Sequence, residues 1–284
     1  KIDRILNDNI FEGINIHYFG GEPLLNIPVL IYLDENIKKI TDKIGIVYKA
    51  FLTTNGSMLS KELLQKVKFL SIQLTFDGLE KTHDRLRVSD HFHFKEEIEL
   101  IENIMNFSQA KVLLRTNICK ENKDEIIALH KYIFEKFGNE RIEINPNRTI
   151  KYHQDDSFEM LSVQEYAEVA YQIKLLWSEQ KGKFELPVPR STPCKFPYGN
   201  AYAISPEGYC TFCSGSMDQE KKYFFDVDIE NKKMFSVRKE CKKCNILPLC
   251  LGGCIIQYNL RAGACTYEKY ELKNILISYI KHIS

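Results

Sequence analysis

The sequence predicts an α/β chain in which a mostly parallel sheet, built as a partial (β/α) barrel, precedes a small cysteine-rich domain. Two observations support this fold class. Over residues 1–150, short runs of β-branched and apolar residues alternate with longer helix-like stretches. Strict alternation of strands and helices favours a parallel sheet with right-handed crossovers. In the second half, eight of the nine cysteines fall between Cys194 and Cys265, which indicates a separate unit organised by its thiols.

The elements of the first part follow from local composition. Five short runs rich in β-branched and apolar residues are predicted strands: residues 14–19, 47–53, 70–76, 112–118 and 141–145. Helices are expected between them at residues 28–41, 60–67, 94–106 and 123–137. The second of these helices has a capping signal, because Ser60-Lys61-Glu62 leads into Leu63-Leu64.

The second part begins after a further helix expected at residues 163–178. Pro187, Pro189 and Pro193 punctuate the chain there, and we place the domain boundary between residues 185 and 186. The domains are therefore expected at residues 1–185 and 186–284. A hairpin is predicted from residues 201–204 and 209–213 around the turn 205–208, and a helix at residues 267–283 closes the chain.

Composition excludes several classes of protein. The chain is 44% hydrophobic and 27% charged, which is ordinary for a globular protein and rules out disorder. Lys and Arg number 39 against 38 Asp and Glu, so no basic field indicates nucleic acid. No apolar run approaches the ~18–20 residues of a membrane span. We expect neither a nucleic-acid nor a membrane partner.

The cysteine count indicates metal binding. An odd total of nine cysteines and the absence of a signal peptide argue against a disulfide framework. We therefore expect a reducing compartment, the cytoplasm, where dense thiols usually bind metal. The run Cys241-x2-Cys244-x5-Cys250-x3-Cys254 places four thiols within 14 residues, with Gly252 and Gly253 permitting close approach of the backbone. This spacing suits either tetrahedral zinc or an iron–sulfur cluster.

The wider pattern distinguishes between these two. In order, the chain reads C-x13-G-x4-C, then C-x2-C-x5-C-x3-C, then C, and Leu247-Pro248-Leu249-Cys250-Leu251-Gly252-Gly253-Cys254 is part of it. This pattern resembles the SPASM domain of radical S-adenosylmethionine (SAM) enzymes, which carries two auxiliary [4Fe–4S] clusters. The resemblance implies ligands for a first cluster: Cys194, Cys213 and Cys254, with Cys210 either completing the set or being a free structural thiol. It implies ligands for a second cluster: Cys241, Cys244, Cys250 and Cys265.

The ends of the predicted strands carry a second set of signals. Gly20-Gly21-Glu22-Pro23 closes the first predicted strand, Asn55-Gly56 follows the second, and Thr75-Phe76-Asp77-Gly78 closes the third. The carboxyl ends of parallel strands form the edge where such barrels bind ligands. Each motif also has a plainer interpretation: Gly-Gly-Glu-Pro can be a tight turn with a solvated Glu22, and Asp-Gly is common turn chemistry.

These motifs also resemble the radical SAM barrel, a (β/α)6 fold, and the resemblance then covers essentially the whole chain. It implies that Gly20, Gly21, Glu22 and Pro23 grip the methionyl amino group of SAM. It implies that Thr75 lies near the ribose or carboxylate, with Asp77 nearby and Asn55 as a weaker candidate. His83-Asp84-x-x-Arg87 follows Asp77 at the family's distance.

Arg115 is a further candidate on the fourth strand. It should point away from the side on which Leu114 and Thr116 lie, because successive side chains of a strand alternate. It either pairs with the cofactor carboxylate or forms an ion pair inside the barrel.

One family feature does not occur in these residues. Radical SAM enzymes hold their catalytic cluster with Cys-x3-Cys-x2-Cys, and Cys119 is the only cysteine before Cys194. Residues 1–9 read like the end of the first helix, so we expect this chain to begin inside the domain, with the third cluster's ligands in a preceding segment. A relative that has lost its radical cluster is the alternative. No catalytic residue is indicated.

The resemblance implies a radical SAM peptide maturase. A 5′-deoxyadenosyl radical would abstract hydrogen from a ribosomal peptide and install a thioether or carbon–carbon crosslink, or another oxidation, with a flavodoxin- or ferredoxin-type electron donor. A sulfatase-maturating enzyme is less favoured, because Ser214 stands where that branch usually has Asp. A non-catalytic iron–sulfur scaffold and a zinc-stabilised binding module remain as alternatives.

Overall fold

The structure is a computed structural model that describes residues 11–138, 141–151, 158–191, 201–208, 210–211, 238–254 and 265–283. The chain divides into two compact units, Lys1–Thr149 and Ile150–Ser284. This division falls before the last helix that the sequence assigns to the barrel. The domain boundary at residues 185/186 stays a prediction.

The first unit contains a five-stranded sheet in which neighbouring strands are consecutive in the chain and all pairs are parallel. The strands are β1 (Gly13–Tyr18), β2 (Val47–Thr53), β3 (Phe69–Thr75), β4 (Lys111–Ile118) and β5 (Ile142–Arg148). The predicted α/β class is therefore confirmed. β5 continues past Pro146, where the sequence predicted an end, because β5 is an edge strand of the described sheet and an edge tolerates proline.

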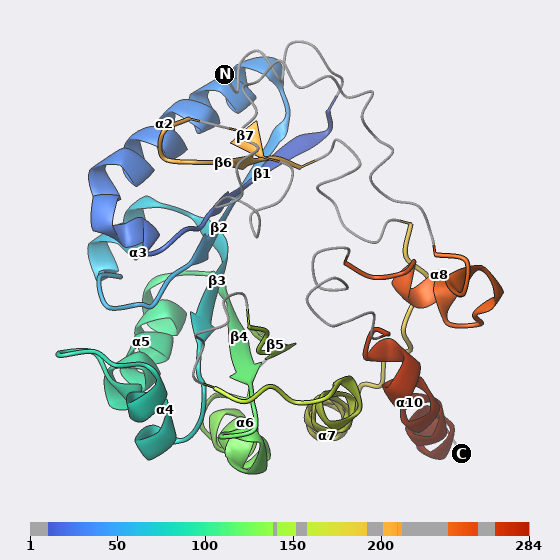
Figure 1. Cartoon of the computed structure of the whole chain (residues 1–284). Coiled ribbons are helices and arrows are strands. Elements are labelled where there is room, and N and C mark those ends of the chain that lie inside the picture. Colours follow the sequence, from blue (N-terminus) through green and yellow to red (C-terminus); the bar gives the residue numbers. More distant parts are fainter. Residues whose placement is uncertain are drawn as a thin grey trace. The chain divides into compact units, whose positions relative to one another are not determined.

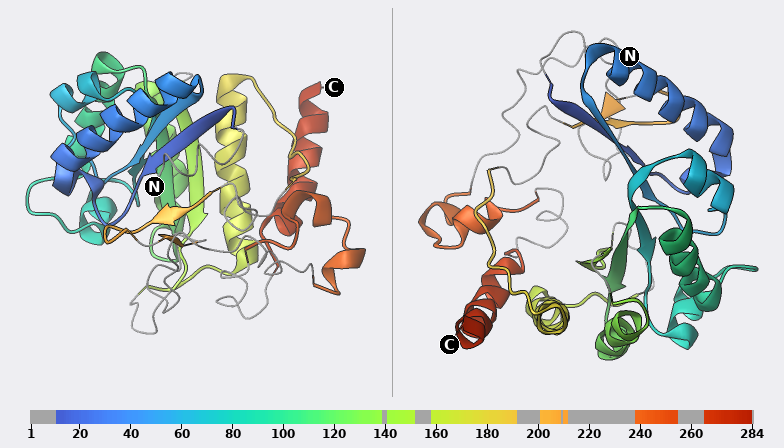
Figure 2. Two further views of the ribbon diagram at one scale, coloured as in Figure 1. Left: turned by 90° about the horizontal axis from the view of Figure 1, so that it is seen from above. Right: turned by 180° about the vertical axis from the view of Figure 1, so that it is seen from behind.

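The helices of this unit all lie on one side of the curved sheet (Figures 1 and 2). They are η1 (Pro23–Asn26), α2 (Ile27–Ile44), α3 (Lys61–Lys66), α4 (Glu80–Leu86), α5 (Phe94–Phe107) and α6 (Lys123–Phe137). The predicted cap of α3 is present, since Leu63 N donates to Ser60 Oγ at 3.3 Å. Helix α4 was not predicted, because it is short and its N-cap, Leu79, makes no side-chain bond to the backbone.

The two faces of the sheet differ in chemistry. Alternate side chains on the helix-covered face are apolar and almost fully buried: Leu52, Ile72, Leu74, Val112, Leu114 and Ile142. The residues between them, on the opposite face, are largely polar: Thr53, Gln73, Thr75, Arg115, Asn117, Asn145 and Asn147. A parallel sheet covered on both sides reads as continuous apolar strands. Polar residues at alternate positions therefore distinguish this polar face from the helix-covered one, and Gln73 and Thr75 on it are themselves buried.

The second unit has a pair of long helices, α7 (Val163–Lys181) and α10 (Glu268–Ile283). Polar contacts join them: Tyr171 Oη lies 2.6 Å from Ser278 Oγ, and Lys174 Nζ lies 2.7 Å from Glu271 Oε1. Burial raises the pKa of the Glu271 carboxyl, and the Lys174 ammonium offsets part of that rise.

Short elements complete this unit. β6 (Ala203–Ile204) and β7 (Cys210–Thr211) pair antiparallel around the turn closed by Gly208 N and Ser205 O, as the sequence predicted. η5 (Cys241–Lys243) and α8 (Leu247–Cys250) carry cysteines of the dense motif.

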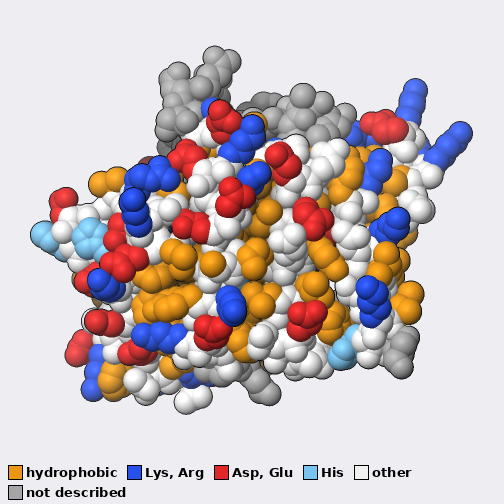
Figure 3. All heavy atoms as spheres, turned by 90° about the horizontal axis from the view of Figure 1, so that it is seen from below, with side chains coloured by type: hydrophobic (Ala, Val, Ile, Leu, Met, Phe, Trp, Pro, Cys, Tyr) orange, Lys and Arg blue, Asp and Glu red, His pale blue; other side chains and the backbone are white. Residues whose placement is uncertain are grey.

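None of the helices in the described part of the chain is long and apolar enough to cross a membrane. Lys and Arg side chains are interspersed with Asp and Glu on the face drawn in Figure 3.

Candidate functional site

Glu22 organises the turn that follows β1. One carboxylate oxygen, Oε1, accepts hydrogen bonds from Leu24 N at 3.0 Å and from Thr54 Oγ1 at 2.7 Å. The other, Oε2, accepts a hydrogen bond from Asn55 N at 2.7 Å. The first contact caps η1, and the other two fasten the end of β1 to the end of β2. Glu22 is thus not a solvated turn residue, because it fixes the shape of this part of the edge.

The backbone before Glu22 is open. Gly20 has a φ of +156°, which L side chains rarely adopt, and no heavy atom lies within 4 Å of the position that a Cβ would take on Gly20 or Gly21. Glycine is thus required at residue 20 by its backbone conformation rather than by crowding. The open peptide groups can face a ligand directly.

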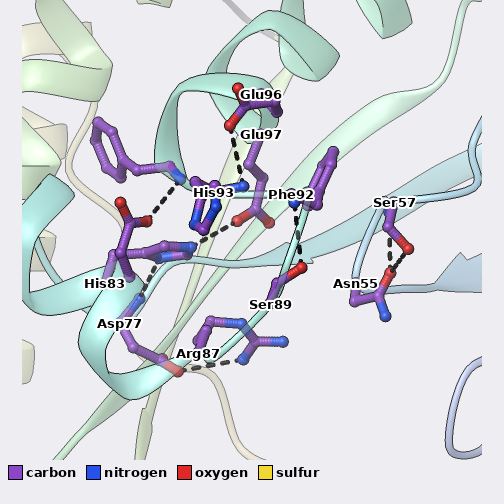
Figure 4. Close-up of polar contacts among 12 residues, drawn as sticks. Asn55, Ser57, Asp77, His83, Arg87, Ser89, Phe92, His93, Glu96 and Glu97 are labelled. Atoms are coloured by element: carbon purple, nitrogen blue, oxygen red, sulfur yellow. Dashed lines mark hydrogen bonds and ion pairs between the residues drawn. The ribbon is translucent and has the colours of Figure 1, made fainter.

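Asp77 ties together the ends of β3 and β4, and its contact with Arg87 is drawn in Figure 4. Its Oδ1 accepts a hydrogen bond from Asn117 N at 3.0 Å, and its Oδ2 lies 3.2 Å from Arg87 Nη1. Asn122 Nδ2 donates to the carbonyl oxygen of Asp77 at 2.8 Å. The carboxylate is therefore used within the protein, and Asp77 shapes the edge rather than presenting a free charge to a ligand.

A buried pair of side chains, His83 and Glu97, holds the backbone of Asp77 in place. Asp77 N donates to His83 Nδ1 at 3.4 Å, and His83 Nε2 lies 3.2 Å from Glu97 Oε2 (Figure 4). Because Nδ1 accepts, the proton of a neutral His83 lies on Nε2 and points at Glu97. Burial raises the pKa of the Glu97 carboxyl, and the contact with His83 offsets part of that rise. The sequence motif contained His83 and Arg87 but gave no indication of Glu97.

Polar side chains on the polar face of the sheet form a connected row. Thr75, Arg115 and Asn145 are in register across β3, β4 and β5. Arg115 Nε donates to Asn117 Oδ1 at 2.9 Å, and Asn145 Nδ2 donates to Gln73 Oε1 at 3.0 Å. As predicted, Arg115 lies on the face opposite the buried Leu114 and Thr116.

Sequence reasoning missed much of this row: Gln73, Asn117, Asn145 and Asn147. The signal was present in the strands themselves. Polar residues recur at every second position of β3 and β5 and, with the exception of Leu113, of β4, although a fully buried parallel strand has no use for them. Reading each strand for the period of its polar residues would have identified the whole face.

The edge and the row together fit an elongated polar ligand. The Glu22 turn lies at the ends of β1 and β2, whereas Thr75 and Arg115 lie on β3 and β4. Three inter-strand steps separate β1 from β4, or about 14 Å at ~4.8 Å per step. A ligand that contacts both the glycine turn and Arg115 must span about that distance.

A second site lies within the second unit, where four cysteines line one pocket: Cys241, Cys244, Cys250 and Cys265. Arg238 and Lys269 also line it, together with apolar Ile246 and Leu247, and its lining contains no carboxylate among the described residues. Burial raises the pKa of the Cys241 thiol, Cys250 and Cys265 raise it further, and the Arg238 guanidinium opposes the rise.

These residues fit a thiolate-bound metal group. Four sulfur donors with two nearby cations suit a centre that carries net negative charge once the thiols are deprotonated. Among the described residues, no three His, Cys, Asp or Glu side chains stand close enough to share a single metal ion. A cubane cluster takes one thiolate at each of four irons, so its ligands stand farther apart than those of one zinc ion.

The backbone around this pocket is specialised. Leu251, Gly252 and Gly253 all have positive φ, at 47°, 86° and 72°. A left-handed Leu is unusual and costs about 1–2 kcal/mol. A Cβ on Gly253 would overlap the side chain of Thr266, which follows Cys265, so glycine permits the two cysteine-bearing segments to approach.

Arg190 holds the same two segments together. Its backbone N donates to Pro248 O of α8 at 2.9 Å, and its Nη2 donates to Glu268 Oε1 of α10 at 2.8 Å. Cys250 ends α8, and Cys265 stands three residues before α10. Arg190, which the sequence analysis did not single out, therefore joins the segment of Cys250 to that of Cys265.

The other predicted cluster is only partly described. Cys254 is described and does not line the four-cysteine pocket. Cys194 and Cys213 lie outside the described residues, and only the backbone of Cys210 is described, in β7. The first cluster's ligand set therefore stays a prediction.

Solved structures with the same fold span this chain almost completely. One is anSMEcpe, an anaerobic sulfatase-maturating enzyme, solved with bound AdoMet (SAM): TM-score 0.71, 17% identity, covering 100% of this chain and 89% of that one. The same enzyme with AdoMet and the Kp18Cys peptide gives a TM-score of 0.67 at 17% identity, covering 99% and 89%. Streptococcus suis SuiB bound to S-adenosylmethionine gives 0.59 at 16% identity, covering 94% and 66%. No family model and no curated protein matches the sequence.

Proposed function

We propose that this chain, which has the fold of the radical SAM maturases with a SPASM domain, binds SAM on the polar face of its sheet and modifies a peptide or protein. The observation that carries the proposal is the polar row along β3–β5 together with the turn ordered by Glu22. A binding module or an inert scaffold has no need of a polar, ligand-sized face on a parallel sheet.

The roles of the residues follow from their positions. The open peptide groups of Gly20 and Gly21 accept from the methionyl ammonium, and Glu22 and Pro23 hold that turn in shape. Thr75 and Arg115 would face the ribose hydroxyls of the cofactor, because its carboxylate shares a carbon with the ammonium and so stays near the glycine turn. Asn55 and Asp77 act indirectly, since Asn55 N binds Glu22 and the Asp77 carboxylate is bound by Asn117 and Arg87. These contacts would position the cofactor.

The four-cysteine pocket supports an iron–sulfur cluster as the second cofactor. Cys241, Cys244, Cys250 and Cys265 would hold it, and it would supply one-electron redox chemistry to the oxidation of the substrate. Cys194, Cys210, Cys213 and Cys254 would hold the other auxiliary cluster. The 284 residues contain no Cys-x3-Cys-x2-Cys triplet, so the proposal requires a third, catalytic set of ligands that these residues do not supply.

The substrate class is a peptide. We favour a ribosomal peptide that acquires a crosslink or another oxidation. A second candidate is formylglycine formation in a sulfatase, favoured by the higher TM-score of 0.71 with anSMEcpe against 0.59 with SuiB. Ser214, in place of the Asp usual in that branch, speaks against it.

The test is SAM cleavage by the intact protein, purified without oxygen and reduced with dithionite. Formation of 5′-deoxyadenosine that is lost on substitution Arg115→Leu supports the proposal. The exposed Lys39→Gln variant is the matched control, because Lys39 lies on α2, on the opposite side of the sheet from the polar face. Two peptides, one from a sulfatase active site and one encoded beside the enzyme's gene, separate the two substrate classes by mass spectrometry. A protein that binds SAM but never cleaves it would contradict the catalytic proposal.

A further inference from the structure

We propose that the loop carrying Cys241 and Cys244 is the docking surface for an acidic one-electron carrier protein, which meets the chain at Lys239, Lys242 and Lys243. The inference rests on the proposed function, since it requires a redox cluster in the four-cysteine pocket. It goes further by naming where the carrier binds and which chemistry recognises it.

The loop has a local excess of positive charge that the chain as a whole lacks. Residues 238–244 read Arg-Lys-Glu-Cys-Lys-Lys-Cys, four cations against one anion, whereas the full chain has a net charge of only +1. The single acid, Glu240, is already paired, with its Oε1 3.5 Å from Arg238 Nη1. Because Glu240 is paired with Arg238, the net positive charge of the loop comes from its three lysines.

The lysines are available to a partner. All three are exposed, and none of them has an ion pair with any residue in the described part of the chain. Other lysines do form such pairs, for example Lys174 with Glu271 and Lys111 with Glu143. A carrier that supplies carboxylates therefore displaces no existing contact at this loop.

The lysines are next to the pocket by covalent geometry. Lys242 and Lys243 stand between Cys241 and Cys244 in sequence and belong to the same 3₁₀ turn, η5. Each is one peptide unit, about 3.8 Å between Cα atoms, from a cysteine that lines the pocket. Cys241 is buried whereas Lys242 and Lys243 are exposed, so a protein seated on the lysines lies next to a segment that lines the pocket.

The chemistry of the loop favours a protein carrier over a nucleic acid. Residues 238–254 contain no Phe, Tyr, Trp or His, so the loop offers no ring on which a base can stack. The basic patch is three residues wide, whereas nucleic-acid interfaces use extended basic surfaces. Charge complementarity between a small basic patch and an acidic surface steers association and sets orientation.

The exchange is a simple electron transfer. A cluster held by Cys241, Cys244, Cys250 and Cys265 would pass one electron to the docked, oxidised carrier. The cluster would be oxidised by one electron and the carrier reduced by one, with any proton that the reduced carrier requires taken from solvent. Arg238 and Lys269, which line the pocket, offset its negative charge from inside, while the loop lysines face the partner.

The experiment uses the intact, cluster-loaded protein under anaerobic conditions, with an oxidised acidic flavodoxin as the probe. Binding is measured by titration calorimetry at low and at high salt, for wild type and for Lys242→Glu/Lys243→Glu. The matched control is Lys39→Glu/Lys43→Glu, which reverses two exposed charges on α2. Iron content and visible absorption are recorded for every variant.

We expect the loop variant to bind flavodoxin at least about tenfold more weakly, a change of ~1.4 kcal/mol. Lys242→Gln/Lys243→Gln should fall between, wild-type affinity should drop as salt rises, and the α2 variant should bind like wild type. Equal binding by both double-Glu variants, at wild-type iron content, overturns the docking inference but leaves the proposed function standing. Tight binding of single-stranded RNA in place of flavodoxin also overturns it. Wild-type protein without iron or sulfide overturns both, because the electron then has no source.

Discussion

Glu22 shows how one side chain shapes a cofactor edge without reacting. Both of its oxygens are used, by Leu24 N, Thr54 Oγ1 and Asn55 N, so the carboxylate acts as a bracket between two strand ends. The peptide groups of Gly20 and Gly21 are left to meet a ligand. Asp77 has the same function at the ends of β3 and β4. The edge is thus rigid before any cofactor binds, which lowers the entropy cost of binding.

The first prediction concerns Glu22→Gln, which keeps the size of the side chain but replaces one acceptor oxygen with an NH2 group. That group then faces a donor, either Asn55 N or the Leu24 N and Thr54 hydroxyl pair. We expect a loss of about 1–3 kcal/mol in the free energy of unfolding and at least about tenfold weaker SAM binding, measured by urea unfolding and calorimetry. Glu12→Gln, an exposed change just before β1, should alter neither. Unchanged SAM affinity in Glu22→Gln would show that SAM binding does not depend on the hydrogen bonds that the Glu22 carboxylate accepts.

The second prediction concerns His130, which is fully buried on α6 with Nε2 3.0 Å from Thr116 Oγ1. Burial lowers its pKa from 6.5 to about 3. Above pH 6.5 the imidazole is neutral in both states and contributes nothing to pH dependence. Between pH 6.5 and 3 the unfolded chain binds the proton and the folded chain does not, so stability falls as pH falls, by ~1.4 kcal/mol per pH unit.

His130→Asn removes this term. Between pH 7 and pH 5, the free energy of unfolding of wild type should fall by about 2 kcal/mol more than that of the variant. Urea titrations at the two pH values measure the difference, and the many other groups that titrate cancel in it. If the free energy of unfolding of the two proteins fell equally between pH 7 and pH 5, His130 would not be the source of this pH dependence.

At the scale of elements, the sequence predicted what depends on local pattern. The five strands and four of the six helical segments of the first unit have a clear period or cap, as Ser60 does for α3. Helix α4 and the turn η1 were missed because seven and four residues are too few to show an apolar period. Glu97 and Arg190 could not be found, because their importance depends on partners far away in the chain, His83 and Glu268.

The third prediction is that Arg190 controls the four-cysteine pocket through two elements. Arg190→Met loses the bond to Glu268 of α10, and Lys174→Met loses the neighbouring α7–α10 pair with Glu271. Both changes leave a carboxylate buried without its partner, so both should lower Tm by several degrees. Only Arg190→Met removes a contact at the N-terminal end of α10, three residues after Cys265. We expect it alone to reduce bound iron and to broaden the electron paramagnetic resonance signal of the reduced protein.

Arg190→Lys provides the complementary measurement. Its backbone bond to Pro248 is kept in every variant, and a lysine can restore one charged contact to Glu268 but not the guanidinium geometry. Partial recovery of the iron content by Arg190→Lys is expected. If Lys174→Met lost as much iron as Arg190→Met at equal Tm, general destabilisation would explain the loss instead.

At the scale of the whole molecule, the cysteines divide by position in the chain. Eight of nine lie in residues 194–265, and five of these are described at the side-chain level, four of which line one pocket. The family resemblance named these four as one ligand set, whereas local spacing alone grouped Cys241, Cys244 and Cys250 with Cys254. The pocket's cations, Arg238 and Lys269, carried no such signal, since isolated basic residues are common on any surface.

The last prediction is therefore the metal content of this chain, reconstituted with iron and sulfide without oxygen. Two clusters with four thiolates each account for all eight cysteines of residues 194–265, giving about eight irons and eight sulfides per chain. Cys265→Ala removes one of the four thiols that line the described pocket and should lower the iron content towards about four per chain. Cys119→Ala, a buried cysteine at the end of β4, should leave the iron content unchanged. Zinc without sulfide in the native protein, or full iron retention by Cys265→Ala, would show that the pocket holds something other than a four-thiolate cluster.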